Sequence, residues 1–173
     1  VLLGAWPSLG VQVGVLIGAR GLVPIAPLLE RLAIEGVSFW QFPTLLWWSA
    51  SDTVISAGTW LGGALALSAL LGLYPRICFA LSAPLYLSYT VAAQTFLSFQ
   101  WDNLMVEMAV LAALLPDRGG RHPALWMHRL LLFKLMFESG LAKWQSHLGD
   151  WHDGSAMSHY YQTAPLPTPG GWY

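Results

Sequence analysis

The chain has 173 residues, of which 55% are hydrophobic and 10% are charged, and its net charge is −1. Because soluble globular domains carry about 25% charged residues, this composition argues against an ordinary soluble domain and predicts an integral membrane protein. The 8 Lys and Arg residues form no basic stripe, which argues against nucleic acid as a partner.

Cys78 is the single cysteine, so the sequence predicts neither an intrachain disulfide nor a cysteine zinc cluster. The first residues, from Val1 onward, are apolar, without an initiator Met, a basic segment or a cleavage site. The last residues, Trp172 and Tyr173, end the sequence abruptly. We therefore expect this chain to be an internal fragment of a longer protein.

Five apolar segments approach the length of about 20 residues that a helix needs to cross a membrane. They are residues 1–19, 54–73, 77–97, 102–115 and 124–142. Together they predict an all-α fold, a polytopic transmembrane bundle of about five spans over residues 1–143. Gly58 and Gly62 supply small residues for close helix packing in the second span, and Pro84 predicts a kink in the third.

The short connections after the second and fourth spans carry Arg76, Arg118 and Arg121, which favours the cytoplasmic side for both. The long connection 20–53 and the tail 144–173 are then expected to be extracytoplasmic. The tail is polar and proline-rich, and it predicts an irregular segment that leads to a missing C-terminal region. Its last part reads either as an extended polyproline-like strap on the membrane face or as a linker.

Gln100, Asn103 and Glu107 are spaced so that they share one helical face at the start of the fourth span. A lone carboxylate in an apolar helix is costly and normally faces a partner inside the bundle. Lys134 in the fifth span is the expected partner of Glu107, although Glu138 could pair with Lys134 one turn away. These five residues form a candidate polar intramembrane site, with a structural ion pair as the alternative.

No catalytic residue, metal site or cofactor is predicted. His147, His152 and His159 lie near Asp150 and Asp153 in the tail, but their spacing matches no known set of metal ligands. Gly-x-Ser-x-Gly is absent from the sequence, and neither Gly62-Gly63 nor Gly119-Gly120 belongs to a phosphate-binding loop.

Four segments in this order resemble the lipase maturation factor family: GARGLVP at 18–24, SFQWDNLMVE at 98–107, LFKLMFESGLAK at 132–143 and HYYQTAPLPTP at 159–169. The last segment is the most specific. The motif residues that the resemblance assigns to the outer face are Arg20, Gly21, Pro24, Trp101, Asp102, Lys143, His159, Tyr160, Pro165, Pro167 and Pro169. The chain departs from the family pattern at Met108 and Ala109, where Thr-Gly is usual, and lacks an acidic residue near Tyr161.

The resemblance implies a membrane-anchored factor that assists the folding and assembly of secreted proteins such as lipases. Its membrane would be the endoplasmic reticulum in a eukaryote or the inner membrane in a bacterium. Tryptophans 47, 48, 101, 151 and 172 would receive hydrophobic client segments or, alternatively, anchor the chain at the membrane interface.

A more distant similarity to the membrane domain of vitamin K-dependent carboxylase and to DoxX-like proteins supports a second hypothesis. This alternative is a membrane enzyme or lipid-binding protein that uses Glu107 and Lys134. The sequence favours the non-enzymatic role and leaves the oligomeric state open.

Overall fold

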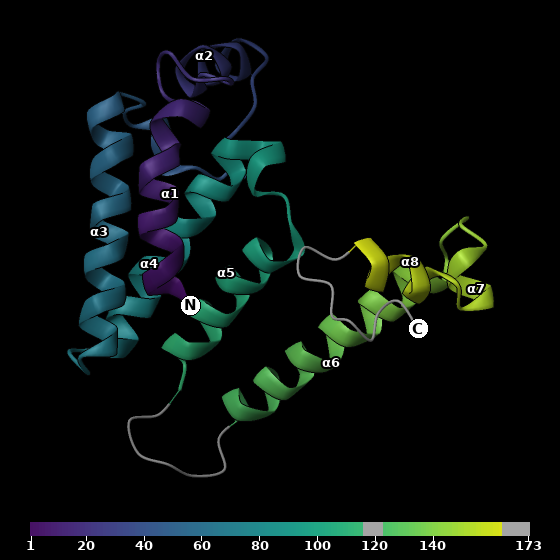
Figure 1. The fold of residues 1–173 in the computed structure, drawn as a ribbon. Helices are drawn as coiled ribbons and strands as arrows, with labels where there is room; N and C mark the ends of the chain where they lie inside the picture. Colours follow the sequence, from purple (N-terminus) through teal and green to yellow (C-terminus); the bar gives the residue numbers. More distant parts are fainter. Residues whose placement is uncertain (116–122, 164–173) are drawn as a thin grey trace. The chain divides into compact units, whose positions relative to one another are not determined.

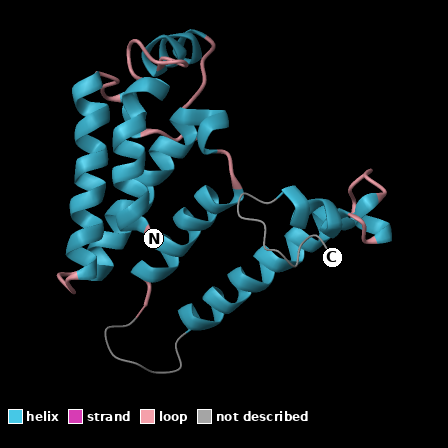
Figure 2. Ribbon diagram, in the orientation of Figure 1, coloured by secondary structure: helices cyan, strands magenta, loops and turns pink. Residues whose placement is uncertain are grey.

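The computed structural model describes residues 1–115 and 123–163, and every regular element within these ranges is a helix, as predicted (Figures 1 and 2). The elements are α1 (Leu2–Ile17), α2 (Ile25–Ile34), η1 (Leu45–Trp47), α3 (Asp52–Leu70), α4 (Pro75–Ala93), η2 (Gln94–Leu97), α5 (Gln100–Ala113), α6 (Pro123–Trp144), α7 (Asp150–Asp153) and α8 (Ala156–Thr163). The chain divides into two compact units, Val1–Leu125 and Trp126–Tyr173, whereas the sequence suggested a boundary after residue 143.

Two helical segments in the described ranges are long and apolar enough to cross a membrane: α3, and the continuous stretch Pro75–Leu97 formed by α4 and η2. Helix α1 is apolar but has only 16 residues. Helix α5 has 14 residues and is therefore about 21 Å long. This is shorter than the hydrocarbon core of about 30 Å, so the count of five spans stays a prediction.

Trp6 lies at the centre of the first unit, where α1 packs against α3 and α4. Its side chain is 1% exposed, and its indole Nε1 donates a hydrogen bond of 3.3 Å to Ser82 Oγ. The ring makes edge contacts with Tyr86 and Tyr89 of α4, with centroid separations of 5.2 and 5.8 Å. These contacts bury a large apolar surface and satisfy the polar N–H of the indole.

The glycines of α3 make room for these rings. A methyl group on Gly62 would overlap the Trp6 ring, and one on Gly58 would overlap the Tyr89 hydroxyl. That hydroxyl donates a hydrogen bond of 2.5 Å to the backbone carbonyl of Ile55. The Gly-x-x-x-Gly pattern therefore serves helix packing within one chain, with aromatic side chains filling the space beside it.

A buried hydrogen-bond network ties the long connection between α2 and α3 to the bundle. Thr44 is 0% exposed, and its Oγ1 lies 2.8 Å from Ser88 Oγ and donates to the Ser88 carbonyl at 3.1 Å. Ser88 Oγ also accepts the backbone N–H of Leu45 at 2.7 Å. Because buried backbone groups need partners, these bonds allow η1 to pack against α4.

Hydrogen bonds near both ends of α5 join it to α4. Near its start, the Tyr86 hydroxyl donates to Asp102 Oδ1 at 3.0 Å. Just beyond its end, the Nε of Arg76 donates to the carbonyl of Leu115, where a cation also complements the helix dipole. The two helices therefore run antiparallel.

The second unit contains most of α6, followed by α7 and α8. Many apolar side chains of α6 are exposed, among them Phe133 at 61% and Met136 at 67%. The sequence predicts an irregular tail, whereas the structure has two short helices there, α7 and α8. Gly154, with a φ of +86°, ends α7 in the left-handed conformation, so that α8 can begin two residues later. Residues 164–169, where the polyproline-like strap is predicted, lie outside the described ranges.

Gly62→Ala should destabilise the fold by about 1–3 kcal/mol, because the added methyl group forces the rigid Trp6 ring to move. Gly63→Ala is the matched control, since its methyl group would meet only Trp6 Cβ at 3.9 Å. Thermal unfolding in detergent, followed by circular dichroism, measures both variants. Equal midpoints for the two variants would contradict the assigned packing.

Thr44→Val removes a buried hydroxyl at nearly constant volume and leaves Ser88 without one of its partners. We expect a loss of about 1–3 kcal/mol in unfolding free energy. Thr53→Val, at an exposed position in the first turn of α3, provides the control. Equal unfolding midpoints for Thr44→Val and Thr53→Val would show that the network adds little stability.

Candidate functional site

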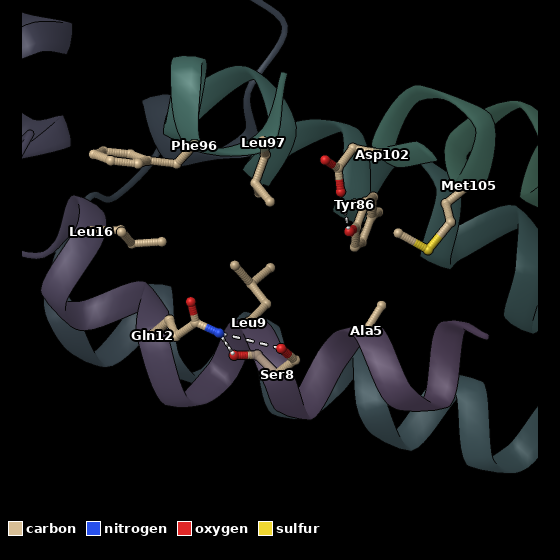
Figure 3. Close-up of a pocket in the computed structure, with 10 residues that line it drawn as sticks. All are labelled: Ala5, Ser8, Leu9, Gln12, Leu16, Tyr86, Phe96, Leu97, Asp102 and Met105. Carbon is tan, nitrogen blue, oxygen red and sulfur yellow. Dashed lines mark hydrogen bonds between the residues drawn. The ribbon is translucent and has the colours of Figure 1, made fainter. Parts of the chain in front are cut away.

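A groove of about 220 Å³ opens on the first unit, with α1 on one side and η2 and α5 on the other (Figure 3). Apolar side chains form most of its wall, and four polar side chains interrupt them. The residues that line it are Ala5, Ser8, Leu9, Gln12, Leu16, Tyr86, Phe96, Leu97, Asp102 and Met105.

Asp102 is the charged residue of this groove, and it is only 4% exposed. Its Oδ1 accepts the hydroxyl of Tyr86, whereas its Oδ2 is buried and has no hydrogen-bond partner within the described ranges. A buried carboxylate oxygen without a donor is costly, and such groups usually have a partner. The unmet Oδ2 therefore marks the groove as the candidate site.

Asp102 is tied to a candidate span. Tyr86 lies halfway along the candidate span Pro75–Leu97, and its hydroxyl bonds directly to Asp102.

Gln12 lies on the opposite wall of the groove, on α1 (Figure 3). Its Nε2 donates to the backbone carbonyl of Ser8 at 3.1 Å and to Ser8 Oγ at 3.3 Å. Because a carbonyl only accepts, these bonds fix which end of the amide is nitrogen. The Oε1 atom is left pointing toward the groove as a second acceptor.

The five residues of the polar site predicted from sequence do not line this groove. Gln100 and Asn103 are exposed and Glu107 is half-buried on α5, outside the lining of the groove. Lys134 and Glu138 are exposed on α6. Glu107 and Lys134 belong to different compact units, so their pairing stays a prediction.

The motif at 18–24 has a structural explanation. Gly21 packs so closely that a methyl group would lie 2.9 Å from the Leu16 carbonyl and from the Gly18 nitrogen. The chain turns back here, and the backbone N–H groups of Leu22 and Val23 cap carbonyls of the last turns of α1. Pro24 is the N-cap residue of α2, and Arg20 is exposed.

The remaining motif residues occupy varied surroundings. Trp101 is 62% exposed and stacks on Phe99 at 5.0 Å, whereas its neighbour Asp102 is buried in the groove. In the second unit Lys143 Nζ lies 5.0 Å from the centroid of the Trp151 ring, a cation–π contact. His159 and Tyr160 are exposed on α8, and Pro165, Pro167 and Pro169 lie outside the described ranges.

One carboxylate of the second unit has a shifted titration. The pKa of Asp153 is held below its ordinary value, chiefly by a hydrogen bond from the Ser155 side chain and also by the Ser155 backbone N–H, which donates at 2.8 Å. Asp153 and the neighbouring histidines form no group of metal ligands within residues 1–115 and 123–163.

The groove could not be predicted from helical spacing. That spacing puts Gln100, Asn103 and Glu107 on one face of α5 and Asp102 on another. The partner of Asp102, Tyr86, lies on α4, and Gln12 of the opposite wall lies on α1, so only the fold brings these residues to one groove.

Within residues 1–115 and 123–163, the chain is a helical domain with two helical segments that are long and apolar enough to cross a membrane. The family model described as "Lipase maturation factor transmembrane domain" matches residues 1–173. The chain belongs to the lipase maturation factor family, as the sequence motifs predicted.

Among its relatives, lipase maturation factor 2 of Rattus norvegicus is 36% identical over 201 residues, and that of Homo sapiens is 34% identical over 202 residues. Each alignment covers 100% of this chain and 28% of the relative. Lipase maturation factor 1 of Homo sapiens is 28% identical, over 91% of the chain and 31% of the relative. The chain thus spans under a third of the length of these relatives, and no solved structure matches it.

Tyr86→Phe removes the hydrogen bond to Asp102 and leaves both carboxylate oxygens without a donor from the described residues. We expect a loss of about 1–3 kcal/mol in unfolding free energy. Tyr74→Phe, at a residue that is 77% exposed, is the control. Thermal unfolding in detergent measures the difference, and equal stability of the two variants would argue against a buried Tyr86–Asp102 bond.

Proposed function

We propose that this chain is the membrane domain of a factor that assists the folding and assembly of secreted proteins such as lipases. The observation that carries the proposal is the family match over all 173 residues, together with 36% identity to a lipase maturation factor 2. The domain anchors the factor in the membrane and presents a surface to its client.

The client-facing surface is proposed to combine the connection between α2 and α3 with the start of α5. Trp48, on the connection, is 82% exposed, and Trp101, on α5, is 62% exposed. Exposed tryptophans of this kind supply rigid contact area for an apolar client segment. Trp47 contributes less, because it is half-buried and donates its indole N–H to the Phe42 carbonyl.

The position of the domain in the cell is part of the same proposal. The membrane is that of the endoplasmic reticulum in a eukaryote or the inner membrane in a bacterium. Residues 20–53 and the tail from 144 onward lie on the extracytoplasmic side of the membrane. Secreted clients fold on that side. The positive charges of Arg76, Arg118 and Arg121 in the opposite connections support this orientation.

The test uses cells that lack the full-length protein and secrete a lipase. The wild-type gene should restore secreted lipase activity per molecule of lipase, measured by enzyme assay and immunoblot. A Trp48→Ser and Trp101→Ser double variant should bind its client at least roughly thirtyfold more weakly, because truncating even one interface tryptophan costs about 2 kcal/mol or more. Secreted specific activity should fall accordingly.

Trp60→Ser is the matched control, because Trp60 is 77% exposed on the candidate span α3 and lies outside the proposed surface. All variants are compared at equal membrane abundance. Unchanged lipase activity in the deletion cells would overturn the proposed function. Equal effects of the double variant and of Trp60→Ser would overturn the proposed surface only.

A further inference from the structure

The groove holds one buried hydrogen-bond acceptor, Asp102 Oδ2, that has no partner within the described ranges. The Oδ2 atom has almost no contact with solvent, so bulk water does not compensate for the missing donor. This acceptor calls for a ligand that brings an N–H or O–H donor.

The charge of the lining favours a cationic donor. The ten residues that line this groove include one acidic side chain, Asp102, and no basic one. Hydrogen bonds between a cation and a carboxylate are roughly twice as strong as those between neutral groups. A primary ammonium carries three N–H donors, so one can bond to Asp102 while the others stay hydrated at the open side of the groove.

The rest of the lining selects a small ligand with an apolar part. Leu9, Leu97, Phe96 and Met105 surround the acceptor. The volume of about 220 Å³ is below the range of about 300–1,000 Å³ that is typical of drug-sized ligands. It suits a cationic head with a short alkyl chain, and the flexible side chain of Met105 can move to admit it.

We propose that this groove binds an amphipathic primary ammonium, which donates an N–H group to Asp102 Oδ2 while its alkyl part packs against Leu9, Leu97 and Met105. The ammonium can come from a free alkylamine or from the ethanolamine headgroup of a lipid. This proposal does not depend on the proposed function, and it stands whether or not a lipase is the client.

The test uses the purified chain in phosphatidylcholine nanodiscs, titrated with n-hexylamine at neutral pH and followed by calorimetry. We expect saturable binding and a rise in the unfolding temperature, because a ligand that binds only the folded state stabilises it. Hexanol, which lacks the charge, and hexyltrimethylammonium, which lacks N–H donors, should bind at least roughly tenfold more weakly. Equal binding of either one would overturn the proposal.

One variant tests the acceptor. Asp102→Asn should weaken hexylamine binding at least roughly tenfold, and it retains an oxygen that can accept the Tyr86 hydroxyl. Asp150→Asn, exposed in the second unit, is the matched control. Wild-type affinity in Asp102→Asn would overturn the proposal.

Two further measurements distinguish a lipid headgroup from a free amine as the source of the ammonium. Nanodiscs enriched in phosphatidylethanolamine should compete with hexylamine if the lipid headgroup is the ligand. If the lipid does not compete while hexylamine still binds, the ligand is a free amine. Ethanolamine, which has the head without an alkyl chain, should bind more weakly than hexylamine in either case, and equal affinity would contradict the role of the apolar wall.

Discussion

Trp6 makes the contact on which the first compact unit depends. Its indole occupies space that α3 leaves open at Gly62, packs edge-on against Tyr86 and Tyr89, and donates to Ser82. One side chain from α1 is thereby fixed against both α3 and α4. Since lipid gives little hydrophobic drive for helix association, such tight packing and a satisfied N–H hold the helices together.

The same packing positions the groove. Tyr86 contacts Trp6 with its ring and Asp102 with its hydroxyl, so the buried carboxylate rests on the central aromatic cluster. Asp102 is therefore held in the wall of the groove opposite Ser8 and Gln12 of α1. A structural contact and a polar site share one tyrosine, which explains how a costly buried carboxylate can keep a defined geometry.

Polar side chains play two different roles in this domain. The hydrogen bonds of the Thr44–Ser88 network join the connection between α2 and α3 to α4. Their donors and acceptors all belong to the chain, and the bonds stabilise the fold. At Asp102 one oxygen is bonded and the other is not. A buried network whose hydrogen bonds are all made is typical of a structural role, whereas a buried acceptor without a donor in a groove is typical of a binding site.

The sequence by itself determined the membrane class, the positions of the main helices and the family, because composition, apolar run length and short motifs are local properties. It also identified Gly58 and Gly62 as packing positions. It did not find the groove, because Gln12, Tyr86 and Asp102 are separated by up to 90 residues and helical spacing relates only near neighbours. Only the tertiary structure decided which carboxylate is buried and which polar groups face it.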